Sequence, residues 1–330
     1  MTARGPRLSG RLAQYRDRVH GLTPKLPEPD GRLATAGYLA RGIAMLALLD
    51  ANAALIRRHA HVPDGWWDAG DFPWLRALEA QVPQIRAEVE AYLAQRTIPS
   101  TADVNGLSGE GTGAEGEAIP GGAGQWRVLL LQSFGQVIPA NADHFPKTIA
   151  ALAGTPATAN IGFSCMDPGS RIELHRDPNA GALRVHLPLI VPEGGECRIT
   201  VNGTEVAWEE GHSLVFHLHA LHETCNLSDG RRVLLVMEIP MPLRFPLSVV
   251  NRFTQWAYRA LPTYRGITDR ARDLALDPSF DVDAAEPVDA VEVTDHESSG
   301  LDRSDDVAAD VPPARAPVSG SSRATLADPG

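Results

Sequence analysis

The chain has 330 residues, of which 43% are hydrophobic, and its formal net charge is -11 at pH 7. This length and apolar content can supply one large core with appended segments. Lysine occurs only at Lys25 and Lys147, and no basic stripe runs along the sequence. An acidic chain of this kind is not expected to have nucleic acid as its main partner.

Three widely spaced cysteines, Cys165, Cys197 and Cys225, match neither a disulfide framework nor a CxxC metal pair. We therefore expect a reducing, cytoplasmic compartment. The N-terminal residues lack the continuous apolar stretch of a signal peptide.

Helical signals dominate the first part of the chain. Residues 1–31 are rich in Arg, with several Pro and Gly, which predicts a flexible basic arm. Residues 34–55 form the most apolar run, but Arg41 and Asp50 leave about 8 uninterrupted apolar residues, whereas a membrane span needs about 20. This run predicts a buried or interfacial helix. Its alternative role is a shallow, non-spanning contact with the inner face of a membrane.

Residues 73–95 carry apolar side chains at steps of three and four, which predicts one helix with a single apolar face. We expect residues 32–96 to form an N-terminal helical segment that packs on the core. Residues 97–125 are rich in Gly and predict a surface loop, with a lid over an active site as the alternative.

From Trp126 the pattern changes to short strand-like runs between turn signals. Asn202–Gly203 separates two of these runs and is typical of a hairpin turn. Many short strands at this spacing predict a jelly roll or barrel over residues 126–245, interrupted by one helix at residues 146–154. The predicted strands are 126–132, 159–166, 170–175, 182–191, 196–201, 204–208, 213–218 and 231–239.

The C-terminal part divides in two. Residues 246–276 are predicted to contain a C-terminal helix, with its clearest signal over 249–261. Residues 277–330 are acidic, rich in Ala, Pro and Ser, and poor in aromatic residues, which predicts a disordered tail.

Histidines and one acidic residue stand at candidate metal positions. In an extended strand alternate residues share a face, so His175 and Asp177 can point the same way, as can Arg184 and His186. A second histidine cluster follows, at His212, His217, His219 and His222.

Arg232 comes ten residues after His222 and begins an apolar strand. A buried, unpaired Arg is costly, so this one is expected to bind an anion. Non-haem Fe(II) oxygenases hold iron with two His and often a carboxylate. An Arg fork suits the far carboxylate of 2-oxoglutarate, which such enzymes use as co-substrate.

At these residues the sequence resembles the aspartyl/asparaginyl β-hydroxylase family of Fe(II)- and 2-oxoglutarate-dependent oxygenases, over roughly residues 66–242. The resemblance implies a mainly β fold, a double-stranded β-helix of the jelly-roll or cupin type, with flanking N-terminal and C-terminal helices. The motifs that carry it are FPKTIAALAG (145–154), FSCMDPGSRIELHRDP (163–178), LRVHLPLIVP (183–192), WEEG (208–211), F-x5-HE (216–223) and the strand at Arg232.

The resemblance also implies roles for single residues. His175 and His222 should bind iron, and Ser164 with Arg232 should bind the distal carboxylate of 2-oxoglutarate. Arg184 and His186 should line the site, near co-substrate and substrate. In FHLHALH the family pattern uses only the last His, so His217 and His219 are expected at the surface or beside the ligands.

Two positions depart from the animal peptide hydroxylases. Those enzymes have Gly where this chain has Asp177, which leaves Asp177 as a third iron ligand, as a group that orients a ligand, or as a turn residue. They also carry an Arg that holds an acidic substrate, where this chain has Ala182. The pattern HRDP-x-AG-x-LR-x-HL is especially similar to the bacterial branch that hydroxylates lipid A fatty acyl chains.

The sequence thus predicts a dioxygenase that uses Fe(II), 2-oxoglutarate and O2 to hydroxylate an unactivated C–H bond. The substrate is an amino-acid or peptide side chain, or a lipid acyl chain. The alternative is a metal-binding jelly roll without turnover, acting as a sensor or interaction module. Ser164 and Arg232 favour the enzyme, because a mere metal binder needs no dicarboxylate clamp.

Overall fold

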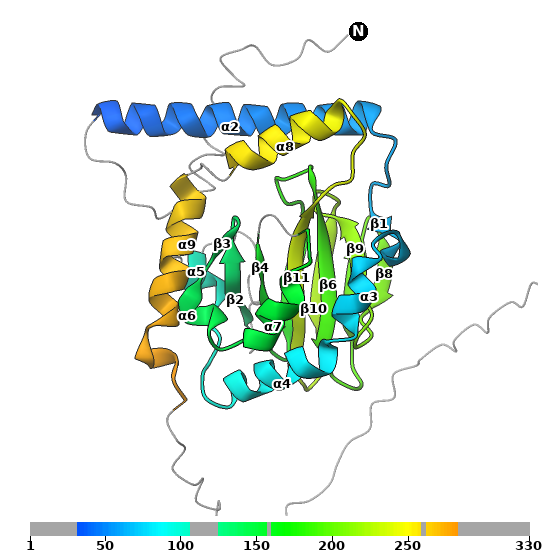
Figure 1. The fold of residues 1–330 in the computed structure, drawn as a ribbon, viewed down its shortest axis with the longest axis vertical. Coiled ribbons are helices and arrows are strands. Elements are labelled where there is room, and N and C mark those ends of the chain that lie inside the picture. Colours follow the sequence, from blue (N-terminus) through cyan, green and yellow to red (C-terminus); the bar gives the residue numbers. More distant parts are fainter. Residues whose placement is uncertain (1–31, 106–124, 157–159, 259–261, 283–330) are drawn as a thin grey trace, which may run out of the picture. The chain divides into compact units, whose positions relative to one another are not determined.

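Two antiparallel sheets form the centre of the computed structural model, which describes residues 32–105, 125–156, 160–258 and 262–282 (Figure 1). The larger sheet has seven strands in the order β1-β9-β6-β11-β4-β2-β3, and the smaller has four in the order β5-β10-β7-β8. Their bounds are β1 Trp66–Trp67, β2 Trp126–Ser133, β3 Gln136–Val137, β4 Ile161–Met166, β5 Ser170–His175, β6 Ala182–Ile190, β7 Cys197–Val201, β8 Thr204–Ala207, β9 Leu214–His217, β10 His222–Asn226 and β11 Arg232–Pro240.

The chain passes between the two sheets in a regular way from β4 to β11. It places β4, β6, β9 and β11 in the larger sheet, and β5, β7, β8 and β10 in the smaller. Every pairing among these eight strands is antiparallel. This winding is the double-stranded β-helix, so the predicted fold is confirmed.

Alternation along the strands separates a helix-packed face from an interior face. In β6 the side chains Leu183, Val185 and Leu187 belong to the main apolar core, together with residues of three short helices. The intervening side chains, Arg184 and His186, lie on the opposite face of the same strand, toward the space between the sheets. The helices that cover the apolar face are α3 Trp74–Glu79, α4 Val82–Leu93 and α7 Pro146–Leu152.

A second apolar cluster closes the space between the sheets. It contains Ile199 and Val201 from the smaller sheet, and Phe216 and Leu234 from the larger sheet. The β7–β8 hairpin turns at Asn202 and Gly203, whose φ angles are 47° and 79°. Positive φ at both turn residues is what the Asn-Gly pair allows, so this predicted turn is confirmed.

Two long helices flank the β-core. α2 Arg32–His59 and α8 Leu247–Tyr258 lie side by side in Figure 1 and are joined by a hydrogen bond from Asn52 to Asn251. α9 Pro262–Ala275 packs beside α5 Thr101–Asn105, and Ala271 shares a small apolar cluster with Val104. The shorter elements are α6 Pro139–Ala142, and the 3-10 turns Ala69–Asp71 and Pro278–Phe280. Within the described part of the chain, no helix is long and apolar enough to cross a membrane.

Several elements differ from the sequence prediction. The helix expected over 73–95 is two helices, because Pro83, which lacks an N–H, lies in the first turn of α4. The predicted C-terminal helix of 246–276 is likewise two, α8 and α9. A short helix, α5, begins the segment expected to be a Gly-rich loop.

The beginning of the predicted tail is also different. Residues 277–282 are ordered against the end of the α4 segment, where Arg96 forms an ion pair with Asp281 and the N–H of Val282 donates to the Gln95 carbonyl. These backbone and charge contacts do not need the apolar content on which the tail prediction rested. The predicted basic arm at 1–31, most of the Gly-rich segment and the rest of the tail lie outside the described residues.

Candidate metal and co-substrate site

Two histidines and one aspartate converge at the open end of the smaller sheet. His175 ends β5 and is the register partner of His222, the first residue of the adjacent β10. Their ring centroids are 4.2 Å apart. Asp177 follows β5 by two residues, and one ligand atom from each of the three side chains lies within 4.8 Å of the other two. We call these three residues the metal end.

Hydrogen bonds at Nδ1 leave Nε2 of both imidazoles available to a metal. Nδ1 of His175 contacts the carbonyl oxygen of Glu173 at 2.7 Å, and Nδ1 of His222 contacts that of Ala220 at 2.8 Å. A carbonyl only accepts, so each Nδ1 carries the hydrogen and each Nε2 keeps a free lone pair. Burial lowers the pKa of His222 to about 4. It is therefore neutral near pH 7, as a ligand must be.

Asp177 points into this cluster rather than only shaping a turn. Its Oδ2 lies 3.9 Å from Nε2 of His222 and accepts from Nη2 of Arg184 at 3.1 Å. The same Nη2 donates to Oε1 of Glu238 at 2.9 Å. The bend after Asp177 is capped by another residue, because Asn179 Oδ1 accepts from the N–H of Gly181. The geometry thus places the Asp177 carboxylate where a third ligand would lie, held by a guanidinium.

Arg232 is buried, and its partners among the described residues are neutral. Its side chain is 1% exposed, and Nη2 donates to Ser164 Oγ at 3.0 Å. Trp126 Nε1 donates to the same oxygen at 3.0 Å, and the ring of Trp208 lies 4.6 Å from the guanidinium carbon. Burial lowers the pKa of Arg232 to about 10, which leaves it charged near pH 7. We call Arg232, Ser164 and Trp208 the Arg232 end.

Unsatisfied donors gather at the Arg232 end. Nε of Arg232 and Nε1 of Trp208 are buried and have no hydrogen-bond partner, and neither has Nδ1 of His186. None of the described acidic side chains forms an ion pair with Arg232. Buried donors without partners are costly and rare. A carboxylate ligand would accept from the Arg232 guanidinium, so the residues present fit 2-oxoglutarate.

His186 lies between the two ends. Its ring centroid is 6.1 Å from that of Trp208 and 5.1 Å from that of Phe216, and Phe216 is in turn 5.3 Å from His222. Burial lowers the pKa of His186 well below its ordinary value, and the charges of Arg184 and Arg232 lower it further. A neutral imidazole thus separates the metal end from the Arg232 end.

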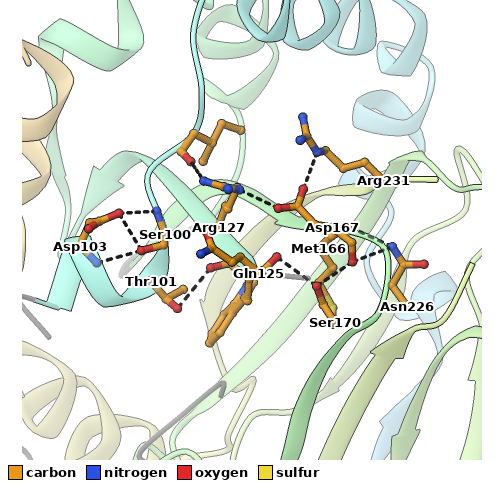
Figure 2. Close-up of polar contacts among 12 residues, drawn as sticks. Ser100, Thr101, Asp103, Gln125, Arg127, Met166, Asp167, Ser170, Asn226 and Arg231 are labelled. Carbon is orange, nitrogen blue, oxygen red and sulfur yellow. Dashed lines mark hydrogen bonds and ion pairs between the residues drawn. The ribbon is translucent and has the colours of Figure 1, made fainter. Parts of the chain in front are cut away.

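A polar network holds the ends of the strands that carry Ser164 and Arg232 (Figure 2). The carboxylate of Asp167, in the turn after β4, accepts from Nε of Arg127 at 2.8 Å and from Nε of Arg231 at 2.7 Å. Asn226 on β10 donates to the carbonyl of Met166 at 2.9 Å. These contacts join β2, β4, β10 and β11, so the backbone that carries Arg232 is held at its first residue.

The structure also places Glu238, which the sequence patterns did not single out, and the other three histidines of the second cluster. Glu238 is a buried acid inside an apolar strand, the same signal that drew attention to Arg232. His217 Nδ1 contacts Asp64, and its Nε2 contacts the carbonyl of Ala180. His219 Nδ1 contacts the carbonyl of Asp177 at 2.6 Å. Both histidines therefore support the loop after β5, whereas His212 is exposed.

Fold and site together define a class, the double-stranded β-helix proteins with a candidate His–Asp–His metal centre. The sequence model of the aspartyl/asparaginyl β-hydroxylase family matches residues 79–242. This part of the chain therefore belongs to that family, and the prediction of the family is confirmed.

Three relatives illustrate the match. Ornithine lipid ester-linked acyl 2-hydroxylase of Rhizobium tropici is 32% identical over 60% of this chain and 66% of its own length. Aspartate beta-hydroxylase domain-containing protein 1 of Mus musculus is 29% identical, over 49% of this chain and 48% of its own length. The aspartyl/asparaginyl beta-hydroxylase of Homo sapiens is 29% identical, over 36% and 16%. The chain thus spans less than two thirds of each of these relatives.

Among solved structures, an oxidoreductase of the 2OG-Fe(II) oxygenase family from Burkholderia pseudomallei gives a TM-score of 0.31 at 17% identity. It covers 58% of this chain and 88% of that one. A Pseudomonas putida prolyl-4-hydroxylase gives 0.27 at 17% identity, over 58% and 98%. These scores are low, so the fold assignment rests on the strand order described above.

Proposed function

We propose that the chain is an Fe(II)- and 2-oxoglutarate-dependent hydroxylase. His175 and His222 would hold the iron through Nε2, with Asp177 as the carboxylate beside them. Iron, when bound, supplies the activation of O2 that hydroxylation of an unactivated C–H bond requires. Overall, 2-oxoglutarate, O2 and substrate become succinate, carbon dioxide and hydroxylated substrate.

The observation that carries this proposal is the unmatched charge of Arg232. A protein that only binds a metal has no use for a buried cation whose Nε has no hydrogen-bond partner among the described residues. A dicarboxylate co-substrate uses one: its distal carboxylate would accept from Arg232 and from the Ser164 hydroxyl. The proposal of a metal-binding jelly roll without turnover leaves these groups unexplained.

The substrate we propose is a lipid acyl chain. The relative from Rhizobium tropici acts, by its name, on the ester-linked acyl group of ornithine lipid. Ala182 is buried, at 2% exposure, so that position offers no cation for an acidic peptide. A peptide side chain remains the second substrate class, because other relatives are named for aspartate hydroxylation.

The test begins with anaerobic addition of Fe(II), followed by 2-oxoglutarate, with iron stoichiometry, co-substrate affinity and succinate formation measured in turn. We expect about one iron per chain, lost in His175→Ala and His222→Ala and kept in the exposed control His212→Ala. Iron binding without any 2-oxoglutarate binding would overturn the enzyme and support the metal-binding alternative. Full iron occupancy in both ligand variants would show that the metal end is misassigned.

A further inference from the structure

The outer face of α8 is apolar and exposed to solvent. Val249, Phe253 and Trp256 are 57%, 54% and 65% exposed, and they follow one another at steps of four and three residues. That spacing places them on one side of the helix. The rings of Phe253 and Trp256 lie 5.8 Å apart, and Phe245, just before the helix, is 81% exposed. These four side chains are the apolar face of α8.

The inner face of the same helix is polar. Asn251, Thr254 and Gln255 are buried, at 1%, 0% and 9% exposure. Asn251 accepts from Asn52 of α2, and it donates to the carbonyl of Gly181 at 2.8 Å. A surface helix of a globular protein normally turns its apolar side inward and its polar side to water. α8 is reversed, so packing on the core does not explain its exposed aromatic residues.

Charge along the segment that carries the apolar face has one sign. The sequence from Ile239 to Thr268 contains no Asp or Glu, although the whole chain carries a net charge of -11. The same stretch contains four Arg, and two whose side chains the structure describes, Arg244 and Arg252, are exposed. Aromatic and aliphatic side chains flanked by Arg are complementary to a surface with acidic headgroups and an apolar interior.

The inner face of α8 contacts the loop that carries Asp177. Gln255 donates to Asn179 Oδ1 at 2.7 Å and accepts from Asn179 Nδ2 at 2.9 Å. Asn179 and Gly181 belong to the loop that begins with Asp177. Contact here is tight, because a Cβ on Gly181 would lie 1.8 Å from Asn251 Oδ1. Whatever surface binds the outer side of α8 is therefore one helix away from the loop that carries the candidate carboxylate ligand.

We propose that the apolar face of α8, with Arg244 and Arg252, docks on an anionic phospholipid bilayer and lies in the plane of its interface. The absence of acidic residues favours lipid over a second copy of this acidic chain or another acidic protein surface. Docking goes beyond the proposed reaction and needs no turnover. Its consequence, that an acyl chain enters the site from the bilayer, rests on the proposed function.

The experiment uses the full chain in flotation assays with two kinds of vesicle, phosphatidylcholine alone and equal parts of phosphatidylcholine and phosphatidylglycerol. We expect binding to the anionic vesicles. Phe253→Ser with Trp256→Ser should weaken it by about 100-fold, about tenfold for each aromatic side chain withdrawn from the interface. Arg244→Gln with Arg252→Gln should weaken binding to the anionic vesicles by about 30-fold and leave binding to neutral vesicles unchanged.

Two controls are built into the chain. Val137 and Leu276 are 48% and 69% exposed and lie outside α8, so Val137→Ser with Leu276→Ser removes comparable apolar surface and should not change vesicle binding. A spectroscopic readout adds a second measurement. Tryptophan emission should shift to the blue on addition of anionic vesicles, and the shift should be absent in Trp256→Phe, in which the other five Trp remain.

Equal vesicle binding by the wild type and the α8 double variant would overturn the proposal. So would the absence of vesicle binding together with a dimer that Trp256→Ser dissociates, because the occupant would then be a second copy. Iron binding and succinate formation are measured on the same preparations. Vesicle binding without 2-oxoglutarate turnover would contradict the proposed function and leave the docking proposal intact. Turnover of 2-oxoglutarate without vesicle binding would contradict the docking proposal and leave the proposed function intact.

Discussion

The two ends of the site surround an arginine in opposite ways. At the metal end, Arg184 faces the carboxylates of Asp177 and Glu238. At the other end, Arg232 contacts the hydroxyl of Ser164 and the ring of Trp208 and, among the described residues, meets no carboxylate. One region therefore has more negative than positive side chains, and the other has an unmatched cation. A divalent metal suits the first, and the carboxylate of a co-substrate suits the second.

This difference separates an arginine that organises the protein from one reserved for a ligand. Removing a guanidinium that is already paired leaves its carboxylates without a partner, which is destabilising. Removing one that has no anionic partner takes away a desolvation penalty from the free protein and a binding group from the complex. The two substitutions should therefore act on different quantities, stability in one case and co-substrate affinity in the other.

The largest effect is expected for Arg184→Met. Loss of the guanidinium leaves Asp177 and Glu238 together without a cation, and breaking a buried pair in this way costs about 3–5 kcal/mol. Arg184 is 19% exposed, so we expect the lower end, about 3 kcal/mol, in the free energy of unfolding measured with urea. The matched control is Arg86→Met, which removes exposed pairs with Glu90 and Glu210 and should cost less than about 1 kcal/mol. An equal loss of unfolding free energy in both variants would show that the pairs of Arg184 stabilise the fold no more than exposed pairs do. The comparison of a structural Arg184 with a ligand-binding Arg232 would then fail.

Arg232→Met should have the next largest effect, on binding rather than on folding. Truncating one partner of a buried charged pair costs about 2–4 kcal/mol, so the affinity for 2-oxoglutarate should fall by roughly 30- to 1000-fold. The free energy of unfolding of the free protein should stay the same or rise. Arg272→Met is the control: Arg272 is exposed and paired with Asp269 on α9, away from the site, and its loss should change the affinity by less than about threefold. Loss of stability with unchanged affinity would show that Arg232 is structural.

The sequence predicts the strand of the Arg232 end better than the strands of the metal end. The strand of Arg232 was predicted because apolar residues surround one charge, and the same signal marks Glu238, which we did not single out. β10 was not predicted as a strand, since its sequence HETCN has no apolar alternation. Its backbone pairs with β5 on one side and β7 on the other, so neighbouring strands, rather than its own side chains, determine its structure. The juxtaposition of His175 and His222 depends on that pairing, and only the resemblance to a family anticipated it.

The reversed polarity of α8 was also beyond the reach of the sequence. The pattern of residues 249–261 indicates an amphipathic helix but not which side faces the protein. Burial of the polar side depends on amide partners far away in the sequence, the carbonyl of Gly181 and the side chain of Asn179. By contrast, the sequence did predict that Arg184 and His186 share one face of β6, because side chains alternate between the two faces of a strand.

A smaller effect is expected for Asp177→Asn. Asn keeps the shape of the side chain and the bend of the loop, while Arg184 retains Glu238 as its anionic partner. We expect retained iron and succinate formation reduced by roughly 10- to 100-fold, as for groups that orient metal ligands. Glu173→Gln, an exposed change two residues before His175, is the control and should have wild-type activity. Complete loss of iron in Asp177→Asn would establish a direct ligand, and wild-type rates would remove Asp177 from the site.

The smallest effect is a pH dependence at Glu238. Burial raises the pKa of this carboxyl group above its ordinary value, and the nearby charge of Asp177 adds to the shift, although Arg184 opposes it. A carboxyl group whose pKa is raised on folding binds its proton more tightly in the folded chain. Its contribution to stability is therefore present below the ordinary pKa of Glu, about 4.3, and is lost as the pH rises through the raised value.

Glu238→Gln removes this titration and keeps a hydrogen-bonding side chain. As the pH rises from about 4 to 7, the free energy of unfolding should therefore fall more in the wild type than in Glu238→Gln, by about 1.4 kcal/mol for each unit of the pKa shift. Urea unfolding at a series of pH values measures the difference. Glu223→Gln, an exposed change on β10, should follow the wild type at every pH. If the stability of the wild type instead rises relative to that of Glu238→Gln as the pH rises, the charge of Arg184 outweighs the effect of burial on Glu238.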